Sequence, residues 1–336
     1  MARTDTLDNF LTDVANSIRI KKGTTEPIIA SEFDTEIESI ESNSATDVFI
    51  DDCTNLFSNS LRLNQLYNIL NICKNVKNTK GMFKECSNLK SLDLSNFDTS
   101  AVTNMNEMFY NCLKLEELNL NGFDTSNVSD FSRMFFQCLN LLNLDVSSFD
   151  TSKATNMNSM FSNCKLLKSF DLNNFDTSNV ANMNSMFSGN ERIKELNLSN
   201  FDISAVRDIS GMFISCEGLQ TLDLSNFDMK NIKSMSNFFY KCYSLTNFKS
   251  FINLGKAYTQ NSNNYSSYKL DLTYSTLLNH ESLMSIINNL YDLNLTYDVA
   301  NGGTLYTQQL MIGATNLAKL TVEEIAIATS KGWNIS

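Results

Sequence analysis

A repeat with a period of 26 residues dominates this sequence and limits what it can fold into. A Met-Phe pair keeps this period from Met82-Phe83 to Met212-Phe213, and a Phe-Asp pair keeps it from Phe97-Asp98 to Phe227-Asp228. A single unit cannot bury its own apolar face, so repeats of this kind stack into a solenoid. Cysteines mark the same period, with Asn190 at the one step where the thiol is missing. They are Cys86, Cys112, Cys138, Cys164, Cys216 and Cys242.

Each unit contains two apolar patterns. The first has the spacing i, i+3, i+4, i+7, which predicts a short helix capped by Asn104 or its equivalent. In one unit it consists of Met105, Met108, Phe109 and Cys112. The second is Leu118-Asn119-Leu120, whose alternation predicts a strand with its Leu side chains pointing inward. Asp98 and its equivalents precede Thr-Ser and predict an Asx-type turn between strand and helix.

These patterns predict an α/β leucine-rich-repeat solenoid over residues 50–250, with parallel strands on one face and short helices on the other. We expect it to be right-handed, with the Met side chains in the core and the thiols as small, reduced apolar fillers. A buried Phe column should run through it. This column consists of Phe83, Phe109, Phe135, Phe161, Phe187 and Phe213.

The unit M-F-x-x-C-x-x-L-x-x-L-D-L-S-x-F-D-T-S-x-V resembles the BspA-like leucine-rich repeat, over roughly residues 50–250. Proteins of that family are mostly surface proteins, and several act as adhesins. The resemblance therefore implies the fold and a surface role, and it implies no catalytic residues.

Residues 1–49 lie outside the repeat and predict a helical attachment or oligomerisation segment. An apolar stripe marks its first helix, formed by Leu7, Phe10, Leu11, Val14 and Ile18. The stripe either packs on the first coil as a cap or binds another subunit. The order L-D-x-F-L-x-x-V-A-x-S-I-R-x-K-x-G-T-T-x-P-I resembles a short module in tail, baseplate and fibre proteins of phages of Gram-positive bacteria. That resemblance implies attachment to a virion.

Residues 251–336 predict strand–helix units that cap the solenoid. Strands are expected at 270–272 and near 305–312, with Asn279 capping the helix that follows the first. Thr321 and Glu324 form a capping box for a last helix that ends at Lys331-Gly332. Terminal repeats of a solenoid need such closure.

Composition excludes several functions. With 26 Lys plus Arg against 37 Asp plus Glu, the net charge is -11, which argues against nucleic acid and anionic membrane as partners. No apolar run is long enough for membrane insertion. The one histidine, His280, has no second His or Cys motif beside it and is expected to be structural. The sequence predicts no enzyme, no cofactor and no metal site.

A polar column on the outward side of the strands is the candidate ligand-binding face, because folding does not dictate what lies between the inward Leu residues. It consists of Asp93, Asn119, Asp145, Asp171, Asn197 and Asp223. A simple solvated face is the alternative. Acidic, amide and hydroxyl groups in such a column suit sugars or basic protein surfaces.

Together these features predict a non-enzymatic virion protein of a phage or phage-derived particle, with a receptor-binding or adhesion role on a tail or baseplate. The expected partners are other virion proteins, through the N-terminal segment, and a host cell-surface polysaccharide or protein; homo-oligomers are a further expectation. The first ten residues lack the apolar stretch of a signal peptide, so release by lysis is expected. The alternatives are an architectural virion component and a bacterial leucine-rich-repeat scaffold or adhesin.

Overall fold

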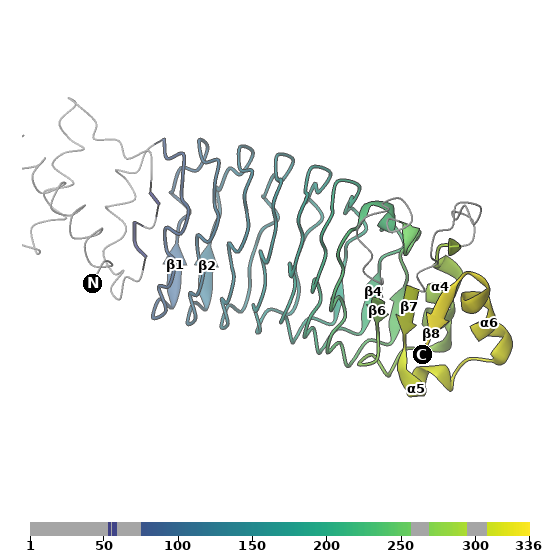
Figure 1. The fold of residues 1–336 in the computed structure, drawn as a ribbon. Helices are drawn as coiled ribbons and strands as arrows, with labels where there is room; N and C mark the ends of the chain where they lie inside the picture. The colour runs from purple at the N-terminus through teal and green to yellow at the C-terminus, as the bar shows by residue number, and fades with distance from the viewer. Residues whose placement is uncertain (1–52, 55, 59–74, 257–268, 294–307) are drawn as a thin grey trace, which may run out of the picture.

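The computed structural model describes residues 53–54, 56–58, 75–256, 269–293 and 308–336. Its main part is a row of stacked coils, followed by a smaller unit of helices and strands at the C-terminal end (Figure 1). The attachment segment 1–49, with its predicted stripe, lies outside the described residues.

Short parallel strands run along one side of the stack. A first sheet pairs β1 (Ser91–Asp93) with β2 (Glu117–Asn119), and a second has the order β3-β4-β5. The strands of the second sheet are β3 (Glu195–Leu196), β4 (Thr221–Asp223) and β5 (Asn247–Lys249). Leu92 lies opposite Leu118, so each residue meets its equivalent one period later. The described solenoid is therefore a leucine-rich-repeat structure with parallel strands, as predicted.

The predicted short helices opposite the strands are wrong. In the Met-Phe segment, every second backbone N–H donates to the next coil, as Phe83 does to the Met108 carbonyl over 2.9 Å. The N–H groups between them close tight turns, as Cys86 does onto the Phe83 carbonyl over 3.2 Å. Glu107 and Asn111 have φ of 58°, a left-handed conformation that no α-helix contains. The i, i+3, i+4, i+7 spacing thus belongs to a ladder of turns that joins neighbouring coils.

Asn104 and its equivalents form a second corner of each coil. The Oδ1 atom of Asn104 accepts a hydrogen bond from the Asn106 N–H over 2.9 Å, which is an Asx turn and not a helix cap. The backbone at this corner bridges to Asp130 of the next coil. The same bridge continues along the stack through Asn78, Asn104, Asp130, Asn156, Asn182, Asp208 and Ser234.

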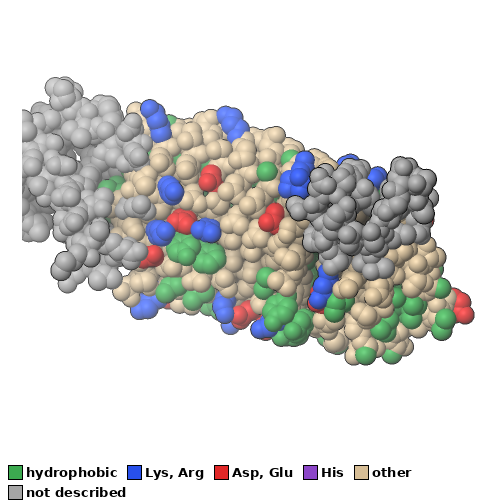
Figure 2. All heavy atoms as spheres, viewed as in Figure 1, with side chains coloured by type: hydrophobic (Ala, Val, Ile, Leu, Met, Phe, Trp, Pro, Cys, Tyr) green, Lys and Arg blue, Asp and Glu red, His purple; other side chains and the backbone are tan. Residues whose placement is uncertain are grey.

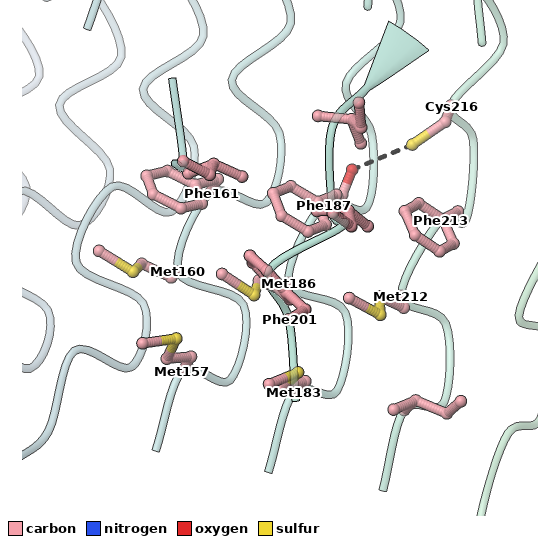
Figure 3. Packing of buried hydrophobic residues seen from close by; sticks show 14 of the residues in the cluster. Met157, Met160, Phe161, Met183, Met186, Phe187, Phe201, Met212, Phe213 and Cys216 are labelled. Atoms are coloured by element: carbon pink, nitrogen blue, oxygen red, sulfur yellow. Dashed lines mark hydrogen bonds between the residues drawn. The ribbon is translucent and has the colours of Figure 1, made fainter. Parts of the chain in front are cut away.

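The Phe column fills the centre of every coil, as predicted (Figure 3). All of its members are fully buried. The Phe83 and Phe109 rings have centroids 5.6 Å apart and planes 2° from parallel, and the separation reaches 6.0 Å between Phe161 and Phe187. Burying each side chain stabilises the fold by about 1.5–3 kcal/mol, and offset stacking adds about 0.5–1.5 kcal/mol per pair. The Met side chains line the same core and are equally buried.

The C-terminal unit has its own parallel sheet in the order β6-β7-β8. Its strands are β6 (Lys269–Asp271), β7 (Gln308–Met311) and β8 (Trp333–Ile335), and its helices are α4 (His280–Asn289), α5 (Gly313–Leu317) and α6 (Val322–Ser330). A 3-10 turn, η1 (Met229–Asn231), lies in the solenoid. The Asn279 cap and the Thr321–Glu324 capping box are both present, as predicted. Strand β8 and helix α5 were not predicted.

Helix α4 covers the last strand of the solenoid. The Phe248 N–H of β5 donates to the Ser282 hydroxyl over 2.8 Å, and the Ser250 N–H donates to the Ser285 hydroxyl over 3.0 Å. These hydroxyls take the place of the carbonyl groups of a further coil. Within the described ranges, no helix has both the length and the apolar character needed to cross a bilayer.

Candidate functional site

The candidate ligand-binding column does point outward from the strands, but folding uses it. The carboxylate of Asp145 accepts hydrogen bonds from the Ser147 N–H over 3.0 Å and from the Ser147 hydroxyl over 2.6 Å. Each member of the column makes the same Asx turn to the residue two positions later. Each of these side chains therefore also closes a turn at the end of its strand, and the ligand-binding role of the column stays a prediction.

Some members of this column also link neighbouring coils. The Asn119 Nδ2 group donates to Asp93 Oδ1 over 3.0 Å, and Lys249 Nζ lies 2.9 Å from Asp223 Oδ2. The hydroxyl and backbone N–H of Ser147 hold the pKa of Asp145 below its ordinary value. Turn formation and charge stabilisation thus act on the same carboxylate oxygen.

The Asp98 column forms the predicted Asx turns at a third corner of each coil. The Ser100 N–H donates to Asp98 Oδ1 over 3.0 Å, and the buried Thr99 hydroxyl donates to the Asp124 carbonyl over 2.9 Å. In each coil, these acidic and amide side chains therefore form turns at the corners of the coil.

The strand ladder opens in the middle of the solenoid. Across the part of the chain that the structure describes, no backbone hydrogen bond joins 143–145 to 169–171, or 169–171 to β3. The Met-Phe ladder opposite stays closed there, with Phe135 N–H donating to Met160 O over 2.9 Å and Phe161 N–H to Met186 O over 3.0 Å. These coils are thus joined by backbone hydrogen bonds at the Met-Phe ladder and not at the strands. We call 143–145 and 169–171 the open ladder.

Phe170 lies at the opening. It occupies the inward strand position that holds Leu118 and Leu196 in other coils and Phe248 in the paired strand β5. Its ring lies 4.7 Å from that of Phe161 and 5.8 Å from that of Phe187, between two members of the Phe column. The ring remains only partly buried.

Exposed apolar side chains gather in separate small areas, and charges of both signs are scattered between them (Figure 2). Leu142, next to the open ladder, is 47% exposed. Further along the stack, the Tyr240 ring lies 4.8 Å from that of Tyr274. Near its start, Tyr110 stacks on Phe136 at 4.9 Å. Sequence reasoning missed these residues, although Leu142 departs from a column that holds polar residues in the other coils.

The thiols are buried, as predicted, and they also donate hydrogen bonds. Cys216 donates to the Phe187 carbonyl over 3.1 Å (Figure 3). Burial raises the pKa of Cys164 and of Cys216 to about 12. At the step where the thiol is missing, the Asn190 Nδ2 group donates to the Phe161 carbonyl over 3.0 Å. The side chain in this column therefore acts as a hydrogen-bond donor as well as a small apolar filler.

His280 begins α4 and joins it to α6, because its Nε2 atom lies 2.8 Å from Glu324 Oε1. The backbone N–H of Thr321, and then His280, hold the pKa of Glu324 below its ordinary value. In the ranges that the structure covers, His, Cys, Asp and Glu side chains form no group of three or more that could hold a metal ion. The interactions described for these residues are hydrogen bonds and packing contacts.

Comparisons with known proteins place the repeat in a family. A solved structure of a leucine-rich repeat protein from Bacteroides ovatus is 15% identical, covering 76% of this chain and 86% of that one, with a TM-score of 0.16. No curated protein matches the chain. The model of a family described as "Mycoplasma protein of unknown function, DUF285" matches residues 51–169 and 166–270. These matches span more than half of the sequence, and the chain therefore belongs to the DUF285 family.

Proposed function

We propose that this chain is a non-enzymatic recognition protein that presents the strand face of its solenoid to a polysaccharide or protein on a host cell surface. One observation carries the proposal. The outward strand positions two residues before the Asx column are exposed, and their residue types change from coil to coil. They are Ser91, Glu117, Asn143, Ser169, Glu195 and Thr221. Variable side chains on a fixed frame are what a repeat protein offers to a partner.

The frame supports several contacts at once. Each coil repeats its neighbour at the spacing of the stacked strands, so equivalent side chains form straight columns. A partner with its own repeat can engage several coils, and each further contact then forms at high effective concentration. Weak contacts at single coils are sufficient for useful affinity on such a surface.

The test is adsorption of the purified full chain to bacterial cells, with a variant that blocks the strand face. Asn143→Arg, Ser169→Arg and Glu195→Arg add bulk and charge at exposed positions outside the turns and the core. Surface changes of this kind cost about 0.5 kcal/mol or less each, so the melting temperature should hold while adsorption is lost.

A control variant also introduces three Arg residues, on another side of the coils. Ser129→Arg, Thr155→Arg and Ala181→Arg occupy an exposed column in which Arg207 and Lys233 already stand. This control variant should adsorb like the unaltered chain. Equal loss in both variants would show a general charge effect, and full adsorption by the strand-face variant would reject the proposed face.

We further propose that residues 1–49 attach the protein to a phage or phage-derived particle, where it serves as a tail or baseplate component. The support is the sequence resemblance of that segment, together with its apolar stripe. Deleting residues 1–42 should leave the solenoid folded and prevent incorporation into particles. An architectural virion component would assemble in the same way but would not adsorb to cells, and a bacterial scaffold or adhesin would not incorporate at all.

A further inference from the structure

We propose that the open ladder, with Phe170 and Leu142 beside it, is the part of the strand face that binds a neutral, hydroxyl-rich glycan chain. This inference rests on the proposed recognition function and deepens it by naming the place and the ligand chemistry. It starts from the difference between these coils and their neighbours. β1 with β2, and β3 with β4 and β5, are paired in parallel, and the coils between them are not.

The open ladder leaves backbone polar groups without protein partners. In the described chain, neither 143–145 nor 169–171 makes a backbone–backbone hydrogen bond, and only Leu142 N–H reaches the previous coil, at Glu116 O over 3.3 Å. Backbone N–H and C=O groups need partners, so here they must come from solvent or a ligand. A sugar hydroxyl both donates and accepts, and it therefore matches a row that offers both kinds of group.

Apolar surface lies next to these polar groups. Leu142 is 47% exposed, and the Phe170 ring is only partly buried although it occupies an inward position. Aromatic and aliphatic side chains contribute by covering the C–H faces of a ligand, while nearby polar groups fix its orientation. A pyranose ring has both parts, an apolar face and a rim of hydroxyls.

The charges at this place favour a neutral ligand. Lys168 and Lys194 lie on the same three neighbouring coils as Asp145, Asp171 and Glu195, and all five side chains are exposed. The signs alternate, so an anionic polymer meets repulsion from the carboxylates and a cationic one meets the lysines. A neutral chain is not opposed by either sign.

Hydrogen exchange and titration test the two parts of the inference in the full chain. Amide exchange at 143–145 and 169–171 should be fast, and exchange at 221–223 should be slow, because β4 is paired on both sides. The probe is the neutral hexamer of N-acetylglucosamine, titrated into the protein by calorimetry. A hyaluronan hexasaccharide, which has the same length and carries negative charges, is titrated for comparison. The neutral hexamer should bind and slow the exchange of the open ladder, and hyaluronan should not.

Two variants test the site itself. Phe170→Leu installs the Leu that most coils hold at this position and removes the ring, so binding should weaken by about tenfold or more. Leu142→Gln installs the side chain that Gln220 provides three coils later and should weaken binding without changing exchange. The control Gln220→Leu places Leu on a paired coil and should create no new binding.

The outcomes separate this inference from the proposed function. If cells adsorb the protein but Phe170→Leu and Leu142→Gln keep full affinity, the strand face binds elsewhere and this inference is overturned. Binding of hyaluronan in place of the neutral hexamer, or of neither sugar by a cell-binding protein, also overturns it. If the protein does not adsorb to cells at all, the proposed function fails, whatever the sugar titration gives.

Discussion

The Cys112 thiol donates a hydrogen bond to the carbonyl oxygen of Phe83, one coil earlier, over 3.1 Å. The same bond recurs from Cys138 to the Phe109 carbonyl at 3.3 Å and from Cys242 to the Phe213 carbonyl at 3.0 Å. Each carbonyl also accepts from a backbone N–H of its own turn. The thiols therefore join coils as well as fill space, and two predictions depend on them.

Native thiols should react slowly. The column from Cys86 to Cys242 is buried, and burial raises the pKa of Cys164 and Cys216 to about 12. Since the thiolate is the reactive form, labelling at neutral pH should require unfolding. Labelling with a maleimide before and after adding denaturant measures this. Fast labelling of most of these thiols in the folded protein would mean that they are not inside the coils.

Asn190→Cys should stabilise the protein. Asn190 is fully buried, and its Oδ1 atom is one of two buried side-chain oxygens without a partner in the described chain. Cysteine keeps one donor to the Phe161 carbonyl and removes the unpaired oxygen. The expected gain is about 1 kcal/mol, measured as the free energy of unfolding in urea. The reverse change, Cys164→Asn, should destabilise, and a loss on Asn190→Cys would contradict the donor role.

The Asx turns make the solenoid acid-sensitive. The hydroxyl and N–H of Ser126 lower the pKa of Asp124, and those of Ser152 lower the pKa of Asp150. Because the pKa of these carboxyl groups is lowered in the folded protein, the stability that they contribute is present above pH 3.8, their ordinary pKa. It is lost as the pH falls through the lowered pKa. The melting temperature should therefore drop below about pH 4. Asp124→Asn with Asp150→Asn keeps both turns and should reduce that drop.

Asp150→Ala should cost about 1 kcal/mol, because the turn loses its acceptor. Asp150→Asn should cost little, since Asn makes the same turn at Asn119 and Asn197 in a neighbouring column. Thermal melting of both variants at neutral pH gives the comparison. Equal stability of the two would show that the turn does not need the side-chain oxygen.

The hydroxyls of α4 protect the end of the stack. Ser282→Ala leaves the buried Phe248 N–H without its acceptor, at a cost of about 1–3 kcal/mol. Ser285→Ala should cost less, because its bond to Ser250 is less buried. Urea unfolding gives both values, and light scattering should show more association once the edge of β5 is free. If Ser282→Ala leaves the free energy of unfolding unchanged, the apolar packing of α4 alone would close the end of the stack.

The core could be predicted from the sequence, because a strict period puts equivalent residues into one column whatever the local conformation. The conformation itself was misjudged at Met105 and Cys112, since a helix and a ladder of turns share the same spacing. One signal pointed to the turns. Gly81 and Gly211 occupy the column of Glu107 and have φ of 59° and 63°, and glycine in a helix interior is costly.

The candidate face was only partly predictable. Its direction followed from the alternation of the strand, but the turns at Asp145 and Asp223 depend on side-chain geometry that no period reports. The pattern of Asp or Asn followed two residues later by Ser or Asn was a usable signal. The opening beside Phe170 could not be predicted, because the same column position holds Phe248 in the paired strand β5.

The register of these coils has a consequence for inheritance. Each donor of one coil finds its acceptor at the same place on the next, so removing one whole period, for example residues 113–138, joins Cys112 to Leu139 and restores every type of bond across the seam. Recombination between the coding repeats can therefore lengthen or shorten the protein by whole coils, and each product keeps the bonds between coils that folding needs. The length of the solenoid can therefore change in a single recombination event, independently of what the surface of the protein recognises.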